Sequence, residues 1–319
     1  MRRWAQRELR DKHIINANTK FDLHMADVWG VDLEGQNCTV SDIQHTAALL
    51  DDHRKRFNLD TLAQDYLGGV EIQRLDETRM ADYSAADVAP RAEYQVTLIA
   101  QLYEKMYPQL REQELERVQE LEDAVIWPVV EMERNGALID IPLLEQFSRE
   151  VLEEHNRLLM DIIKEVGFAW GPTAKGWTRL FQHYGLPVPS SFAEKFVSGI
   201  NHPVIQACHY VAQLASLHSK TFAAYRKQIG SDGILRYGIN QLRGDEGGTV
   251  SGRFSIGYVQ QVPNHDNHSA VFGESWFPRQ LYIGASGQVL SADAAQIEYR
   301  ILAHYAGNRK ILEAYAADP

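Results

Sequence analysis

The stretch Val289-Leu-Ser-Ala-Asp293-Ala-Ala-Gln296-Ile-Glu298-Tyr-Arg300-Ile-Leu-Ala-His304 places one carboxylate between an apolar run and a helical pattern. The residues before Asp293 predict a short strand over 288–291, and those after it predict a helix. An aspartate at the end of a strand can face a cleft and hold a metal ion for phosphoryl transfer. Spacing alone leaves a second interpretation open, in which Asp293 caps the helix. Polar side chains in the first turns of that helix are Gln296, Glu298 and Arg300.

The composition is that of a globular protein, with 319 residues, of which 45% are hydrophobic and 24% charged. Two distant cysteines predict no disulfide framework, and neither a membrane span nor a signal peptide is evident. We therefore expect a cytoplasmic protein without a membrane partner, in a bacterial or phage-infected cell. The net charge of −11 weighs against a protein that coats nucleic acid electrostatically. It permits an enzyme that binds DNA locally and holds divalent metals in carboxylates.

The pattern of apolar residues changes along the chain. Up to about residue 110, short apolar segments alternate with helical patterns, which favours a layered α/β domain. Residues 112–133 are helical in pattern, and Pro128 is expected to interrupt and kink that helix. Two long charged helices over 144–166 and 202–229 should then run antiparallel and project as an arm.

Four segments in order resemble the motifs of family A DNA polymerases. Residues 293–304 resemble motif A. Upstream lie a Ser-Gly-Arg-x-Ser segment at Ser251–Ser255, a Gln-Gln-Val-Pro segment within Val259–Pro263 and an Arg-x-x-Tyr segment at Arg279–Tyr282. This order and spacing identify the chain as resembling that family. Further upstream, residues 127–140 resemble the segment that opens the polymerase domain, so the two long helices would be the thumb.

The resemblance implies roles for individual residues. Asp293 would be a ligand of catalytic Mg²⁺, and Glu298 would be the steric gate against ribonucleotides. Arg253 would contact the primer through the minor groove, where every base pair offers acceptors. DNA contacts are also expected at Gln260, Gln261 and Lys220, and positioning of the dNTP substrate at Gln296 and Arg300. The sequence departs from the family in Ala294 and Ala295, which replace Tyr-Ser, and in Gln261, which replaces Asn.

The N-terminal region resembles the 3′–5′ exonuclease domain of the same family. Asn18–Asp22 is similar to its second motif, and Tyr83–Asp87 to its third. By this resemblance Asp22 and Asp87 would bind metal, and Tyr83 would orient the attacking water. We expect a helix to place Tyr83 and Asp87 one turn apart on one face. The first motif, Asp-x-Glu, does not occur before Asn18, so half of that metal site is expected to be absent.

These observations predict four regions. Residues 1–111 form a partial ribonuclease H-like α/β exonuclease layer, 112–142 a connecting helix, 143–242 a helical thumb, and 243–319 the start of an α+β palm with motif A. The expected chain is incomplete at both ends, because neither a fingers helix nor motif C follows.

The predicted function is template-directed dNTP addition in DNA replication, by a nucleotidyltransferase portion that is inactive alone. Its expected partners are primer–template DNA, dNTP and a complementary polypeptide that carries the fingers and motif C. The alternatives are a non-catalytic DNA-binding subunit of a split polymerase and a degenerate exonuclease.

Overall fold

The computed structural model describes residues 2–69, 75–242, 249 and 252–317. The chain divides into two compact units, Met1–Tyr282 and Ile283–Pro319. The described residues are mostly helical and carry three two-stranded sheets. Among them, no helix has both the length and the apolar content that a membrane span requires. The boundaries expected at residues 111, 142 and 242 stay predictions.

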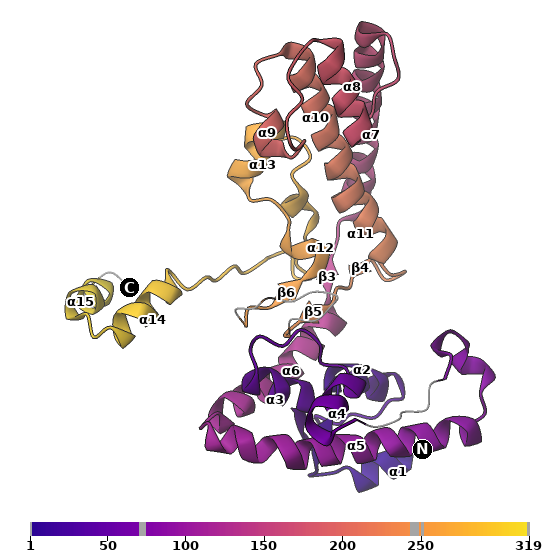
Figure 1. The fold of residues 1–319 in the computed structure, drawn as a ribbon, viewed down its shortest axis with the longest axis vertical. Helices are drawn as coiled ribbons and strands as arrows, with labels where there is room; N and C mark the ends of the chain where they lie inside the picture. Colours follow the sequence, from indigo (N-terminus) through magenta and orange to yellow (C-terminus); the bar gives the residue numbers. More distant parts are fainter. Residues whose placement is uncertain (1, 70–74, 243–248, 250–251, 318–319) are drawn as a thin grey trace. The chain divides into compact units, whose positions relative to one another are not determined.

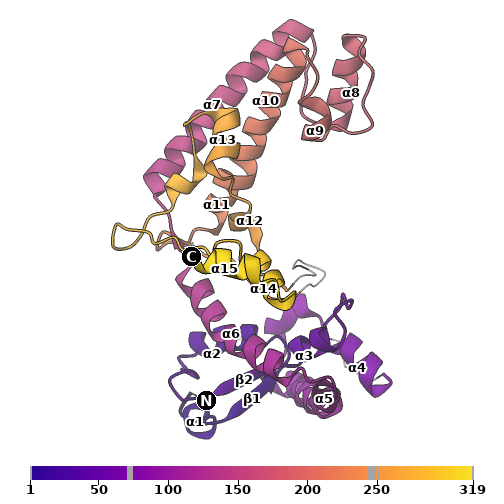
Figure 2. The ribbon, with the colours of Figure 1, turned by 90° about the vertical axis from the view of Figure 1, so that its left-hand side faces the viewer.

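The first unit begins with a small α/β layer. Strands β1 (His13–Asn16) and β2 (Thr39–Asp42) are parallel, with His13 opposite Thr39. Helix α2 (Thr19–Val28) forms the crossover between them, which a parallel pair requires. Figure 2 shows the two strands side by side, with α1 (Arg2–Glu8) next to them. Two further helices follow, α3 (Ile43–Leu50) and α4 (Leu59–Leu67). They continue the alternation of short strands and helices that the sequence predicted for this part of the chain.

A long helix that the sequence did not predict, α5 (Ala85–Glu112), packs against α3 and α4. It begins with a capping box, in which the Ser84 hydroxyl accepts from the Asp87 backbone N–H and the Asp87 carboxylate accepts from the Ser84 N–H. A helix therefore holds Asp87 as expected, but Tyr83 lies outside it, so the expected placing of both residues on one helix face is wrong. Tyr83 ends the preceding 3₁₀ turn, η1 (Glu77–Asp82), because Ser-x-x-Asp is itself a helix-start signal.

Helix α6 (Glu116–Asn135) runs through Pro128, so the expected interruption is wrong, while the expected kink stays a prediction. It ends at Gly136, which has φ 57°, and a Cβ at this position would lie 2.6 Å from the Leu235 carbonyl oxygen. The buried face of α6 is not the face that the spacing of its apolar residues indicated, because several of those apolar side chains are exposed. The buried side chains include three polar ones, Gln119, Asp123 and Glu133.

The helical arm consists of residues 141–228 and confirms the two long helices that were expected. Helix α7 (Ile141–Val166) packs along α10 (Pro203–Leu217), and α8 (Ala174–His183) and α9 (Glu194–Val197) lie between them in sequence, toward the upper end of the pair in Figure 1. A π-helical turn, η2 (His218–Phe222), joins α10 to α11 (Ala223–Gln228). Leu217 and Phe222 are both buried although five residues apart, because the wider π turn shifts the helical register.

Two short antiparallel pairs join the arm to the rest of the first unit. Strand β3 (Ala137–Leu138) pairs with β4 (Ile234–Leu235), and β5 (Ile239–Asn240) pairs with β6 (Ser255–Ile256). Three short helices follow: α12 (Gly257–Gln260), α13 (His265–Phe272) and η3 (Pro278–Leu281). Their apolar side chains join the core of the arm base, which includes Tyr225, Leu235 and Leu281.

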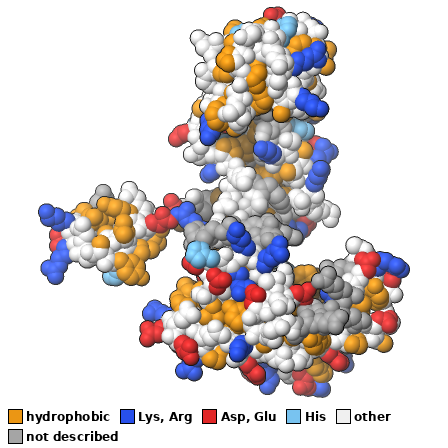
Figure 3. Space-filling model, in the orientation of Figure 1, with side chains coloured by type: hydrophobic (Ala, Val, Ile, Leu, Met, Phe, Trp, Pro, Cys, Tyr) orange, Lys and Arg blue, Asp and Glu red, His pale blue; other side chains and the backbone are white. Residues whose placement is uncertain are grey.

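The second unit is a pair of helices, α14 (Ile297–Tyr305) and α15 (Arg309–Ala317). The strand expected over 288–291 is wrong: these residues are extended without a partner strand, and Leu290 is 94% exposed. A strand obtains its backbone hydrogen bonds from a neighbour, so an apolar run alone does not form one. Hydrophobic side chains lie on the surface of the helix pair (Figure 3), among them Leu302 and Tyr305.

Candidate nucleic-acid interface

A groove of about 990 Å³ lies between the arm and the helices that follow β6. One wall comes from α10 and η2, and the other from the loop after α12 and from α13. Two residues that the sequence predicted as DNA contacts, Lys220 and Gln261, line it from opposite walls. The remaining polar lining residues are Glu194, Gln213, Ser216, Thr221 and Asn267. Folding has thus brought a cation and several amide and hydroxyl groups together in one concave surface.

Lys220 is positioned by the π turn. Phe222 and Leu217 are buried beside α7, and the exposed Lys220 lies between them on the opposite side of the turn. The side chains of Ser148 and His218 lie 3.1 Å apart and fix η2 against α7. Burial, with a contribution from His155, lowers the pKa of His218. A mobile lysine stem on a fixed turn is suited to a phosphate contact.

The opposite wall is held by Arg279. Its Nε donates to the Pro263 carbonyl at 3.0 Å, and a second guanidinium nitrogen lies 3.4 Å from the Val262 carbonyl. These contacts fix the backbone directly after Gln261. The Gln260 side chain turns back toward β6, where its Oε1 accepts from the Ile256 N–H at 2.9 Å and stabilises the segment between the two residues.

Arg253 lies on the exposed bend before β6 and is not among the residues that line the groove. Its carbonyl accepts from the Thr249 hydroxyl at 2.7 Å, which closes the bend. Ser251 of the same motif lies outside the described residues. The structure therefore unites Lys220 with Gln261 but leaves Arg253 on a neighbouring surface.

In the second unit, Asp293 is exposed and precedes α14 by several residues. The N-cap position belongs to Gln296, so Asp293 does not cap the helix. Tyr315 of α15 joins two predicted substrate-positioning residues: its hydroxyl donates to Gln296 Oε1 at 2.6 Å, and the Arg300 guanidinium lies 4.0 Å from its ring centre. Glu298 lies in the first turn of α14, as expected.

The predicted exonuclease residues are not assembled into a metal site. The Asp87 carboxylate serves the capping box. Asp22 accepts a hydrogen bond of 2.6 Å from Asn16. Desolvation and the neighbouring Asp42 carboxylate raise the pKa of Asp22 to about 6, although its side chain retains solvent contact. Over the described residues, no three His, Cys, Asp or Glu side chains form a group able to hold a metal ion, so at most part of the expected Mg²⁺ ligands lies there.

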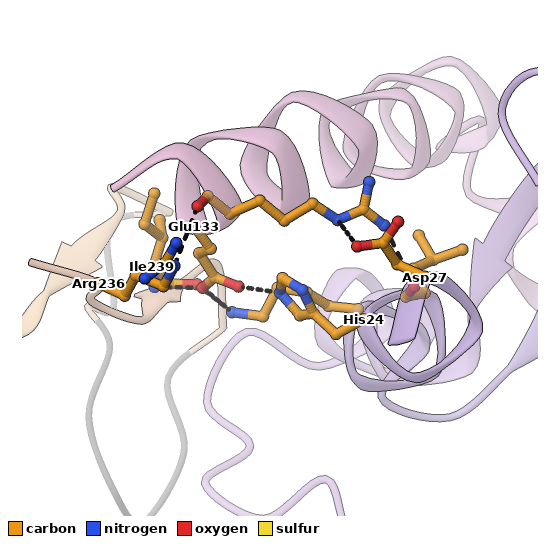
Figure 4. Close-up of polar contacts among 8 residues, drawn as sticks. His24, Asp27, Glu133, Arg236 and Ile239 are labelled. Carbon is orange, nitrogen blue, oxygen red and sulfur yellow. Dashed lines mark hydrogen bonds and ion pairs between the residues drawn. The ribbon is translucent and has the colours of Figure 1, made fainter. Parts of the chain in front are cut away.

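A buried carboxylate that the sequence did not single out joins three segments (Figure 4). Glu133 of α6 accepts from Lys20 Nζ at 2.6 Å and from the Ile239 N–H at 2.6 Å, and it lies 2.7 Å from His24 Nε2. Lys20 also donates to the Ile239 carbonyl at 2.6 Å. Burial pushes the pKa of Glu133 upward, but these hydrogen bonds outweigh it and hold the pKa below its usual range. The Glu133 cluster thus ties α2, α6 and β5 together.

A second polar network lies on the same face of α6. The Asp123 carboxylate accepts from the Ser41 hydroxyl at 2.6 Å, from the Asp42 N–H at 3.1 Å and from Gln119 at 2.8 Å. Burial raises the pKa of Asp123. The only sequence signal for either network was the helical spacing of Gln119, Asp123 and Glu133, which an apolar-periodicity search passes over.

No family model matches the chain. Over 97% of its length it is 28% identical to DNA polymerase DpoZ of Acinetobacter phage SH-Ab 15497, and it covers 55% of that protein. Over 85% of its length it is 26% identical to DNA polymerase I of Pseudomonas aeruginosa, of which it covers 31%. The chain is related to the DNA polymerases. The predicted resemblance to polymerases of the DNA polymerase I kind is confirmed by these relatives.

The fold of the chain also matches that of a solved polymerase domain. The POL domain of Pol1 from M. smegmatis, in complex with DNA primer-template and dNTP, superposes with a TM-score of 0.73 at 19% identity. The match covers 94% of this chain and 51% of that one, and at this identity it shows the fold alone. The chain spans about half the length of two phage relatives, 55% of the DpoZ polymerases of Acinetobacter phage SH-Ab 15497 and Salmonella phage PMBT28.

Proposed function

We propose that this chain is the primer–template-binding portion of a family A DNA polymerase that acts in DNA replication. The groove that unites Lys220 with Gln261 carries the proposal, because a lysine of the second long helix and a motif residue, both expected to contact DNA, meet in one concave surface. In this assignment the helical arm is the thumb, residues 243–319 begin the palm, and the N-terminal layer is exonuclease-like. The phage and bacterial origin of the relatives supports a cytoplasmic place of action.

The groove offers contacts that do not depend on base sequence. The Lys220 ammonium neutralises a backbone phosphate, and the Gln261 amide suits the acceptors that all base pairs present in the minor groove. Glu194 on the same lining repels phosphate and restricts where the strand can pass. This local arrangement allows DNA binding by a chain whose net charge is −11.

The polymerase reaction itself adds a dNTP to a primer end with release of pyrophosphate. In this proposal Asp293 contributes one carboxylate toward Mg²⁺, which would activate the primer hydroxyl when bound. Glu298 limits space at the sugar, and Tyr315 holds Gln296 and Arg300 beside each other for substrate. In this proposal the other ligands come from fingers and motif C outside the described residues, on a further segment or on a complementary polypeptide.

The two alternative functions have less support in the structure. An active exonuclease would need the Asp87 carboxylate at the metal, whereas the helix cap occupies it. A non-catalytic DNA-binding subunit would bind DNA in the same groove. It differs from the polymerase only in what the complex with the complementary polypeptide does. A primer-extension assay of the complex with the complementary polypeptide separates it from the polymerase.

The groove is tested by the binding of a fluorescent primer–template duplex to Lys220→Ala. Removing one phosphate contact should weaken binding several-fold and lower the slope of log K against log salt by about 0.9. Gln261→Ala should weaken binding with no change of slope, since it removes no charge.

Lys105→Ala is the matched control, because Lys105 is an exposed lysine of α5 outside the groove. It should bind the duplex as the unaltered chain does. Equal losses for Lys105→Ala and Lys220→Ala would show that the groove is not the DNA site and that only total charge matters.

A further inference from the structure

The loop that follows α13 contains a strained aromatic residue. Trp276 has φ 56°, a left-handed backbone conformation that bulky side chains rarely adopt, and no other aromatic residue among those described has a positive φ. Such a conformation persists only where the surrounding contacts fix it, and strain of this kind concentrates at functional sites. The contacts around Trp276 therefore indicate which part of the molecule depends on it.

Trp276 is tied to the first long helix of the arm. Its indole N–H donates to the Glu150 carboxylate of α7 at 2.9 Å, although the two residues are 126 positions apart in sequence. Gln146 donates to the other carboxylate oxygen of Glu150 at 2.8 Å. The hydrogen bonds from Gln146 and Trp276 lower the pKa of Glu150, so the carboxylate is ionised at neutral pH and the indole hydrogen bond is charge-assisted.

The same loop is held from within by His268 and by aromatic packing. The His268 ring is 2% exposed, and its Nε2 lies 2.7 Å from the Ser275 carbonyl, directly before Trp276. The ring centres of Phe272 and Trp276 are 6.4 Å apart, and Phe272 also contacts Tyr210 of α10, with 5.7 Å between ring centres. Helix α13 and its loop are thus fixed to both long helices of the arm.

Trp276 is also connected to the groove wall that carries Gln261. Phe272 lines the groove directly. Three residues after Trp276, the Arg279 guanidinium contacts the carbonyls of the two residues that follow Gln261. A shift of the loop at Trp276 would therefore displace Gln261 relative to Lys220, which lies on the arm.

We propose that Trp276 and Glu150 are positioning residues of the DNA groove. Their hydrogen bond holds the wall that carries Gln261 at the separation from the arm at which Lys220 and Gln261 contact one duplex together. Without this hydrogen bond, the left-handed backbone at Trp276 relaxes and the wall moves. Neither positioning residue lines the groove, so both act through Gln261. The inference rests on the proposed function, which makes the groove a duplex-binding site.

The first test measures the separation of the two walls without DNA. Spin labels are placed at Gln206→Cys on α10 and Asp266→Cys on α13, which are exposed positions outside the groove lining, and the native Cys38 and Cys208 are buried. Glu150→Ala should broaden the distribution of label distances measured by electron paramagnetic resonance. Glu150→Gln keeps an acceptor for the indole N–H and should restore the narrow distribution. A distribution that Glu150→Ala leaves unchanged overturns the inference.

The second test measures affinity for the fluorescent primer–template duplex. Trp276→Phe removes the indole N–H but keeps a ring, and it should weaken binding about fivefold, the usual effect of losing one hydrogen bond. This loss should not multiply with that of Gln261→Ala, because both variants remove the same contact with DNA. It should multiply with the loss of Lys220→Ala, which lies on the other wall. If the losses of Trp276→Phe and Gln261→Ala multiply, Trp276 acts through the general stability of the fold and the inference is overturned.

Glu153→Ala is the matched control, because it removes one negative charge from an exposed site of α7 outside the groove lining. It should change neither the label distances nor duplex binding. Equal effects of Glu153→Ala and Glu150→Ala would show that only the charge of α7 matters, and would overturn the inference.

The inference and the proposed function fail separately. If Lys220→Ala and Gln261→Ala weaken duplex binding while Trp276→Phe does not, the groove remains the DNA site and only the positioning role is refuted. If neither Lys220→Ala nor Gln261→Ala weakens binding, the proposed function fails and the inference fails with it.

Discussion

At the scale of single residues, Glu133 joins three segments of the chain through one side chain. Its carboxylate is 8% exposed and contacts Lys20, His24 and the Ile239 N–H. Removing one partner of a buried ion pair leaves the others desolvated and unpaired, which costs about 3–5 kcal/mol. This one residue therefore holds α2, α6 and β5 in register.

We expect Glu133→Ala to lower the free energy of unfolding in urea at pH 7 by about 3 kcal/mol. Glu131→Ala, two positions earlier on an exposed part of the same helix, should change it by less than about 0.5 kcal/mol. Similar losses in both variants would mean that the cluster adds nothing beyond helix propensity.

Asp22 gives a pH-dependent prediction. Its pKa rises from an ordinary value of 3.8 to about 6 on folding, by desolvation and by the Asp42 carboxylate. A raised carboxyl pKa favours the folded state below about pH 4, and this contribution is lost as the pH rises through about 6. Asp22→Asn should therefore have a higher melting temperature than the unaltered chain at pH 8, with the difference shrinking toward pH 4. A difference that is constant between pH 4 and pH 8 would contradict the shift.

At the scale of elements, the residues at the start of α5 fit two local patterns, a catalytic pair and a helix cap, and the structure forms the helix cap. The spacing of Tyr83 and Asp87 suggested two catalytic groups on a helix face. Ser84 ends that possibility, because its side chain caps the helix and draws the Asp87 carboxylate back to the Ser84 N–H. One carboxylate oxygen of Asp87 thus serves the helix cap, and its role as a metal ligand stays a prediction.

Ser84→Ala should cost about 1 kcal/mol of stability, the usual value for the loss of an N-cap. Ser84→Thr retains the oxygen and should cost only a small part of that. The comparison is made by urea unfolding monitored by circular dichroism. If both variants are as stable as the unaltered chain, the capping box does not form in solution.

At the scale of the whole molecule, DNA binding and catalysis are expected to separate. The described residues contain the groove that we propose binds duplex DNA, but no cluster of metal-binding side chains. With Mg²⁺ and dNTP, the chain alone should bind primer–template without extending the primer in a gel assay. Asp293→Ala should leave that binding unchanged, since Asp293 is exposed in the second unit and makes no part of the groove. Templated incorporation by the chain alone would refute this separation.

Local pattern was sufficient for much of the fold. The spacing of apolar residues predicted the alternation of strands and helices before residue 110 and the long helices of the arm, because each depends on a local periodicity. It failed at residues 288–291, where an apolar run lacks a partner strand, and at α6, where buried polar residues interrupt the apolar stripe.

By itself the sequence determined the family resemblance, the helices of the arm and the residue types that DNA binding needs, since motifs and helices are encoded locally. Only the tertiary structure decided which of those residues meet. Lys220 and Gln261 share a groove, Arg253 lies outside its lining, and Asp87 is committed to a helix cap. The reason is physical: contacts between distant segments are fixed by packing and by the partners that desolvated polar groups require, and neither can be read from one segment alone.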